Sequence, residues 1–135
     1  MKSEFLTKLA VTSLSDSLWQ VISVLVYRSR IYKGIITVPE GFVTDFASVP
    51  RVPLVYFAFG NRAHHESVIH DYIYQTHLTS KAKADRIFLE AMKARGKPLW
   101  IRWGMYLGVI LGGRKAYKSG LERYKVLQSI SQTTE

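Results

Sequence analysis

The sequence predicts a single α+β domain, in which a small antiparallel β unit is followed by a C-terminal half of three helices. The first half has short runs of β-branched and aromatic residues between turn signals, which is typical of strands. The second half has longer segments with helical periodicity and with suitable start and stop residues. With 135 residues, 47% of them hydrophobic, the chain is long enough to bury one core. We expect the domain to span residues 1–128, with a flexible tail at residues 129–135.

The β unit is expected at about residues 6–47. Three runs have strand-like composition, at residues 9–13, 18–27 and 35–38. Residues 28–30 and 39–41 provide turn signals after the second and third runs. The segment 41–53 contains two prolines and an isolated Asp, so we expect an ordered loop there and not a central strand.

The helical half is expected at about residues 61–118. Its three helices are predicted at about residues 61–76, 80–95 and 98–118. Asn61 is a suitable N-cap for the first helix, and Thr79 or Ser80 for the second. Gly96 is a suitable residue to end the second helix, and Pro98 fits the first turn of the third.

Three glycines of the third predicted helix, Gly104, Gly108 and Gly112, are spaced by four residues and lie on one face. In an apolar span this spacing is typical of paired membrane helices. The uncharged stretch 103–113 is about half the length that crosses a bilayer. We therefore expect this face to pack closely against another backbone inside the domain.

Composition excludes several kinds of chemistry. There is no cysteine, which excludes a disulfide framework, a thiolate zinc site and a cysteine nucleophile. The first residues make a poor signal peptide, because the apolar run is broken by Lys8 and Asp16. We expect no signal peptide and no transmembrane helix, and a protein located in the cytoplasm or carried in a particle.

The net charge of +9 makes this a basic protein, and the charge is concentrated near the C-terminus. The segment 93–125 has one acid, Glu122, against nine basic residues: Lys93, Arg95, Lys97, Arg102, Arg114, Lys115, Lys118, Arg123 and Lys125. Such a segment suits nucleic acid, a membrane surface or an acidic partner. It equally suits a solvated basic face that keeps the protein soluble.

All four histidines lie in one short stretch, at positions 64, 65, 70 and 77. On a helix, Glu66 and His70 are one turn apart, and His64 and Asp71 are two turns apart. The Glu66–His70 spacing suits binding of one metal ion, but neither spacing is specific, and a His–Glu pair one turn apart is often an ordinary surface hydrogen bond. Histidine and carboxylate together can also transfer a proton near neutral pH.

Asp85 projects onto the apolar side of the second predicted helix, between Leu89 and Met92. A carboxylate that faces the core is costly unless it is paired, hydrogen-bonded or bound to a metal. We therefore expect a partner for Asp85, with His70 and Arg51 as candidates. The alternative is that Asp85 braces a loop by accepting backbone hydrogen bonds.

The loop that follows the β unit mixes polar residues with apolar anchors. Asp45 has the chemistry to bind a metal or orient a histidine, and Ser48 becomes a nucleophile if a base lies within hydrogen-bond reach. The alternative is a tight turn, in which Asp45 or Ser48 accepts backbone hydrogens, Pro50 stiffens the chain and Phe46 fills the core.

These motifs resemble a known family. The likeness lies in residues 38–51, 68–74 and 84–88 and in a later stretch, 105–113. They are similar to the family called domain of unknown function 1353, small proteins encoded by tailed phages, prophages and bacteria. The resemblance spans roughly residues 6–119, and its signature positions are Thr44, Asp45, Ser48, Pro50, Arg51, His70, Asp71 and Asp85. His64, His65 and His77 fall outside that pattern. The resemblance implies a protein of the host cytoplasm or the phage particle, and it implies no particular activity.

Besides nucleic-acid binding by the basic segment, which no recognised motif supports and which predicts affinity that falls steeply with salt, two functions remain open. The first is a small hydrolase whose catalytic candidates are His70, Asp71, Asp45, Ser48 and Asp85. It is either metal-assisted, with a divalent ion held by His70, Asp45 and Asp71, or it uses His70 as a base for water or for Ser48. By analogy with phage enzymes, its substrate is the cell wall. The second is a non-enzymatic virion or assembly protein, which binds phage structural proteins and uses the same residues as a hydrogen-bond network.

Overall fold

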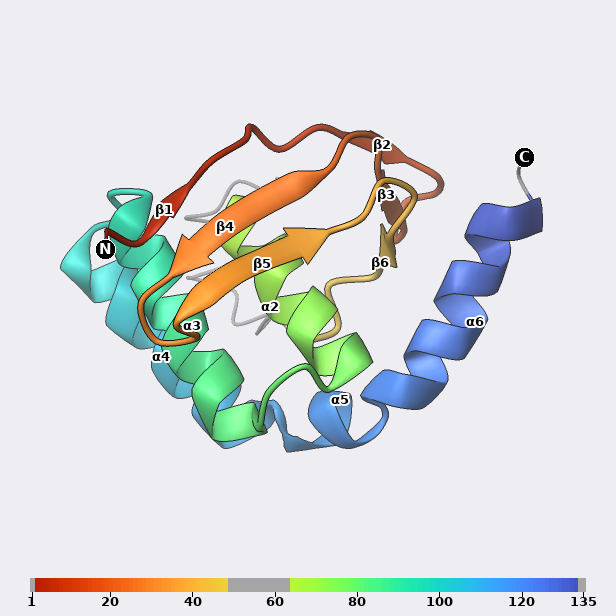
Figure 1. Cartoon of the computed structure of the whole chain (residues 1–135). Helices are drawn as coiled ribbons and strands as arrows, with labels where there is room; N and C mark the ends of the chain where they lie inside the picture. The colour runs from red at the N-terminus through yellow and green to blue at the C-terminus, as the bar shows by residue number, and fades with distance from the viewer. Residues whose placement is uncertain (1, 49–63, 134–135) are drawn as a thin grey trace.

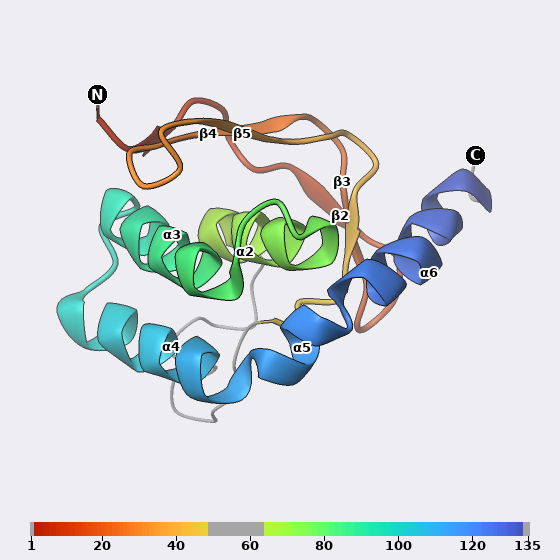
Figure 2. The same cartoon turned by 60° about the horizontal axis from the view of Figure 1, so that its bottom comes forward.

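The computed structural model describes residues 2–48 and 64–133. Two small antiparallel sheets precede a set of helices, which confirms the α+β class. Figures 1 and 2 show the layers: one sheet lies across helices α2 (His65–Thr76) and α3 (Lys81–Ala94), and helix α4 (Leu99–Gly112) packs on the far side of α3. Helix α3 therefore lies between this sheet and α4, and α2 lies beside α3 under the same sheet.

The first sheet has the order β1-β4-β5 and contains β1 (Glu4–Phe5), β4 (Leu25–Ser29) and β5 (Gly34–Val38). Alternate residues of β4 and β5 are buried against the helices, as the two-residue period of a strand requires. The β4–β5 pair confirms the predicted returning strand, although β4 ends at Ser29, inside the predicted turn.

The second sheet has the order β2-β3-β6 and contains β2 (Val11–Ser13), β3 (Trp19–Val21) and β6 (Val43–Thr44). The predicted strand at residues 18–27 is therefore two strands that belong to different sheets. The chain leaves β3 after Val21, where Ile22 and Val24 are exposed despite their strand-like composition. Part of the predicted 41–53 loop is also a strand, because β6 pairs with β3.

The described helical half contains α2, α3, α4, α5 (Arg114–Lys118) and α6 (Gly120–Thr133). The prediction for the second helix is confirmed, because Ser80 Oγ accepts from Lys83 N at its start and Gly96 lies just past its end with φ +76°. The first described helix begins at His65 without a side-chain cap, and the predicted cap Asn61 lies outside the described residues.

Two helical predictions were wrong. The third predicted helix, residues 98–118, is divided at Gly113 into α4 and α5, so the C-terminal half has more than three helices. The expected flexible tail begins inside α6, which continues to Thr133. This last helix packs on α2 and β6, and Gln20 Nε2 donates to Ser131 Oγ, 3.0 Å away. These tertiary contacts explain the order of a segment whose own composition does not demand it.

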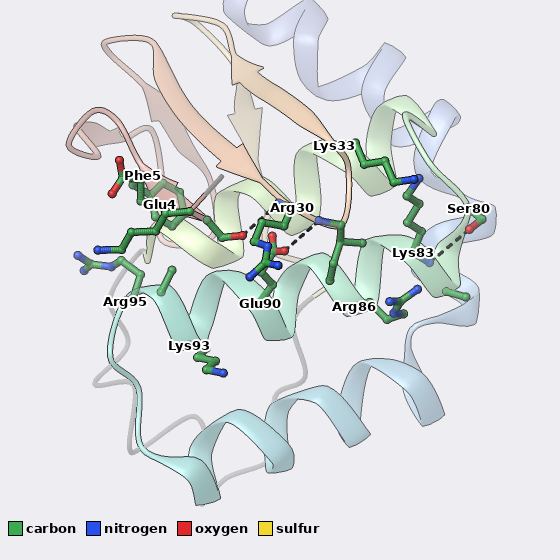
Figure 3. A pocket seen from close by; sticks show the side chains of 15 residues that line it. Glu4, Phe5, Arg30, Lys33, Ser80, Lys83, Arg86, Glu90, Lys93 and Arg95 are labelled. Atoms are coloured by element: carbon green, nitrogen blue, oxygen red, sulfur yellow. Dashed lines mark hydrogen bonds between the residues drawn. The ribbon is translucent and has the colours of Figure 1, made fainter.

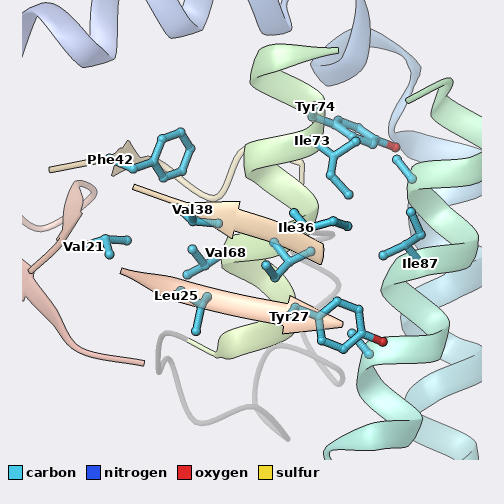
Figure 4. Close-up of a cluster of buried hydrophobic side chains, with 13 residues drawn as sticks. Val21, Leu25, Tyr27, Ile36, Val38, Phe42, Val68, Ile73, Tyr74 and Ile87 are labelled. Carbon is cyan, nitrogen blue, oxygen red and sulfur yellow. The ribbon is translucent and has the colours of Figure 1, made fainter. Parts of the chain in front are cut away.

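Two groups of buried side chains form the core. The larger lies between the first sheet and helices α2 and α3, and Figure 4 shows Leu25, Tyr27, Ile36, Val68 and Ile87 converging there. The smaller lies between α3 and α4 and consists of Phe88, Met92, Ile101, Met105 and Val109. Within the described residues, no helix combines the length and the apolar character needed to span a membrane.

Candidate functional site

His70 lies at the centre of the molecule and contacts one polar residue through each ring nitrogen. Its Nδ1 is 3.1 Å from Ser48 Oγ, and its Nε2 is 2.8 Å from Asp85 Oδ1. His70 is fully buried, and Asp85 and Ser48 are 1% and 2% exposed. The predicted partnership of Asp85 with His70 is therefore present, and a serine completes a chain of three residues from three separate parts of the sequence.

Asp85 is held as a carboxylate. Besides His70, Tyr74 donates to Oδ1 at 2.6 Å and Lys81 Nζ donates to Oδ2 at 2.7 Å. Burial alone would raise the pKa of Asp85, but the hydrogen bonds from His70, Lys81 and Tyr74 outweigh it and hold that pKa below its ordinary value. Lys81 also donates to the backbone oxygen of Val109, so the same ammonium links α3 to the end of α4.

The charge on Asp85 fixes the hydrogens of His70. Burial lowers the pKa of His70, so the imidazole is neutral and has one donor and one acceptor nitrogen. A carboxylate only accepts, so Nε2–H donates to Asp85 and Nδ1 is left as the acceptor. The Ser48 hydroxyl consequently donates to His70 Nδ1. This is the arrangement in which a histidine can remove the serine proton.

The loop that holds Ser48 has a strained backbone. Phe46 has φ +52°, in the left-handed region that is unfavourable for a residue with a large side chain. Thr44 Oγ1 accepts from Phe46 N at 3.0 Å, and Asp45 Oδ1 accepts from Ala47 N at 3.0 Å. These two side chains hold the turn, as the tight-turn interpretation of the loop predicts. The turn carries the chain from β6 to Ser48 beside His70.

A second polar network lies on the other side of α2 and centres on Asp71. Its Oδ2 accepts from Thr44 Oγ1 at 2.6 Å and from Gln75 Nε2 at 2.7 Å. Arg123 Nη1 of α6 lies 3.2 Å from Asp71 Oδ1 and 3.0 Å from Asp45 Oδ1. The guanidinium therefore joins the signature loop, helix α2 and the last helix.

The three proposed metal ligands do not converge. His70 belongs to the Ser48–Asp85 network, whereas Asp45 and Asp71 share the Arg123 guanidinium. Among the described residues, no group of three His, Asp or Glu side chains is arranged to hold a metal ion. A cation already lies between the two carboxylates, so the donor set does not fit a divalent ion.

The other three histidines serve separate local purposes. His64 Nδ1 lies 3.1 Å from Lys97 Nζ, and His77 Nε2 lies 2.7 Å from the backbone oxygen of Tyr117. His65 Nε2 accepts from Leu9 N, and burial, followed by the charge of Arg95, lowers its pKa to about 4. The grouping of histidines in the sequence therefore does not form a four-histidine site, and Glu66 does not share a ligand with His70.

The sequence alone does not indicate several members of both networks. Tyr74 and Lys81 were not singled out, although each lies four residues along a helix from a residue that was, His70 and Asp85 respectively. Arg123 stands out in the sequence only as part of the basic segment, because no local pattern links it to Asp45, 78 residues away. The signature residues Pro50 and Arg51 lie outside the described residues.

A comparison with protein families matches the chain over residues 19–109 to a model described as a protein of unknown function, DUF1353. The chain belongs to the DUF1353 family. The matched region includes Ser48, His70 and Asp85 but ends before Arg123. No curated protein and no solved structure matches the chain. The family match therefore identifies relatives of unknown function, and the chemistry of the site has to be inferred from its geometry.

Proposed function

We propose that this DUF1353 protein is a metal-independent hydrolase in which Ser48 is the nucleophile, His70 the general base and Asp85 the group that orients His70. The observation that supports it is the contact of one neutral histidine with a serine hydroxyl at 3.1 Å and an ionised carboxylate at 2.8 Å. Nucleophile, base and orienting acid in hydrogen-bond order are the minimum that acyl transfer needs.

The proposed reaction begins with transfer of the Ser48 proton to His70 Nδ1 as Oγ attacks the acyl carbon. His70 then gives this proton to the leaving group, and a water molecule deprotonated by His70 releases the acyl group from Ser48. Asp85 stabilises the transient imidazolium through Nε2–H. In serine proteases the two ring nitrogens have the opposite roles. The chemistry needs one accepting and one donating nitrogen, and either order supplies them.

The substrate class we propose is an ester or amide bond, with the cell wall as the first polymer to test. This part rests on the phage connection that the sequence resemblance implies. A neutral histidine in contact with a serine hydroxyl suits acyl transfer. Asp45 and Asp71 have no chemical step in the proposal, because their shared hydrogen bonds to Arg123 make them positioning groups for the loop.

A structural role in a virion or assembly protein is the second candidate, favoured by a different observation. His70 and Asp85 are almost completely buried, and Asp85 is bonded to partners on α2 and α3. Loss of one partner from a buried ion pair costs about 3–5 kcal/mol whichever function is correct. Substitutions of Asp85 or Lys81 therefore cannot separate the two functions.

The variant Ser48→Ala distinguishes the hydrolase from the structural role. It removes one neutral hydrogen bond, which costs about 0.5–1.5 kcal/mol, and it removes the nucleophile entirely. We expect the purified variant to remain folded and to lose hydrolysis of an activated ester such as p-nitrophenyl acetate, and of purified peptidoglycan if that is the substrate. The loss should be at least about a hundredfold, because removal of a nucleophile typically costs more than that.

The matched control is Ser67→Ala, which removes another buried serine hydroxyl from α2 and should leave the rate unchanged. Unfolding of all variants is followed by thermal denaturation. Hydrolysis by Ser48→Ala at the wild-type rate would contradict the nucleophile assignment. A wild-type protein without esterase, amidase or cell-wall activity would favour the structural role.

A further inference from the structure

A wide basic trough lies on the other side of α3 from Asp85. It is lined by residues of the N-terminal strand, the β4–β5 turn and α3, and its volume is about 1630 Å³. Figure 3 shows the basic side chains around it. Small-molecule sites are usually about 300–1,000 Å³. The trough is large enough for part of an extended ligand.

The charge of the trough is strongly positive, with seven basic and two acidic lining residues. On α3, Lys83, Arg86 and Lys93 recur at helical spacing and lie on one side of the helix. Arg30 and Lys33 approach from the β4–β5 turn. None of these five side chains forms an ion pair with another residue in the described ranges 2–48 and 64–133.

The two acids of the trough are engaged by the protein itself. Glu90 accepts from Tyr27 and Ser29 through Oε1 and from the backbone N of Ile31 through Oε2. Glu4 forms an ion pair with Arg28. Their oxygens are therefore held by internal donors, while the five basic side chains without an ion pair in the described part of the chain, Arg30, Lys33, Lys83, Arg86 and Lys93, keep their hydrogens for an external anion.

We propose that this trough binds the phosphate backbone of double-stranded nucleic acid, independently of base sequence. Lys83 and Lys93 are ten residues apart, roughly 15 Å along α3, and this distance matches the length of about four base-pair steps of a duplex. The single aromatic among the described lining residues is Phe5, and its ring packs on Tyr27 and His65 with centroids 4.5 and 5.0 Å away. Single strands are usually held by exposed stacking platforms, so a duplex fits better.

The test is fluorescence anisotropy of the full chain with a labelled 24-base-pair DNA duplex of random sequence, at several NaCl concentrations. We expect binding that weakens steeply with salt, because lysine and arginine release the counterions of the phosphates. In the triple variant Lys83→Gln, Arg86→Gln, Lys93→Gln, the negative slope of log K against log salt should become less steep by about 2–3, and binding should weaken about tenfold or more.

The matched control is Arg114→Gln, Lys115→Gln, Lys118→Gln, which removes the same charge from the exposed side of α5. It should keep most of the wild-type slope and affinity. Equal weakening by both triple variants would show that net charge and not the trough is responsible, and would overturn the proposal. Wild-type binding that is as tight to a single strand of the same length, or to polyglutamate, would overturn it as well. Circular dichroism verifies that both variants are folded.

Discussion

His70 differs from the other three histidines because hydrogen bonds join both of its ring nitrogens to side chains inside the core. An ionised Asp85 on one nitrogen forces the other to face Ser48 as an acceptor. The same burial that excludes water also lowers the pKa of the imidazole. The buried site therefore sets both the base strength and the orientation of the His70 ring, and the residue type alone reveals neither.

This environment predicts how the reaction depends on pH. His70 acts as a base only in its neutral form, and its pKa lies below the ordinary value of about 6.5. The rate of ester hydrolysis should therefore persist as pH falls through 6.5 and should decline only at lower pH. A pH profile of kcat/KM measures this limb. An acid limb at or above pH 6.5 would show that His70 is solvated or is not the base.

At the level of single residues, the sequence indicated part of the site for a physical reason. Asp85 projected onto an apolar helix face, and the cost of an unpaired buried carboxylate required a partner, which is His70. Ser48 was named only on condition that a base lay near it, and His70 meets that condition. Lys81, which neutralises the pair, could not be distinguished from an ordinary surface lysine at the start of a helix.

At the level of elements, a close backbone approach occurs at Gly120, a glycine that the four-residue spacing did not indicate. A Cβ on Gly112 would meet nothing within 4 Å, so the predicted close packing is wrong at that position of the ridge. A Cβ on Gly120, by contrast, would lie 1.9 Å from the backbone oxygen of Tyr74. The start of α6 therefore rests directly on α2, and only glycine leaves room for this contact.

The two glycines give a paired prediction. Gly120→Ala should destabilise the protein by about 1–3 kcal/mol, because the backbone of α2 or α6 must shift to admit the methyl group. Gly112→Ala should be neutral or stabilising by up to about 1 kcal/mol, because alanine favours the helix and nothing is displaced. Urea denaturation compares them. Equal stability of the two variants would contradict the close contact between α2 and α6.

Sequence patterns do not define the bounds of strands and helices that are ordered by contacts with residues far away in the sequence. The run 18–27 has uniform strand composition, yet β3 pairs with β6 and β4 with β5, so the break reflects two different partners. Similarly, α6 continues beyond residue 128 because Gln128 bonds to both backbone groups of Val43 in β6. Local composition contains no information about either contact.

At the level of the whole molecule, the polar networks meet at α2, which contacts both sheets and the helices α3, α5 and α6. Ser48 comes from the signature loop, Asp85 from α3 and Arg123 from α6. The α+β class follows from local patterns of strand and helix. The assembly of these networks depends on contacts across most of the chain, so the complete site becomes visible only in the folded structure.

The central claim, that Ser48 is activated by His70, is tested most directly by covalent labelling with a fluorophosphonate. The Ser48 oxygen displaces fluoride from phosphorus, and His70 takes up the proton. Intact-mass measurement and peptide mapping should find one phosphonyl group, located on Ser48, in the wild-type protein and none at that peptide in Ser48→Ala or His70→Gln. A folded wild-type protein whose Ser48 stays unlabelled, or is labelled equally in His70→Gln, would contradict the account.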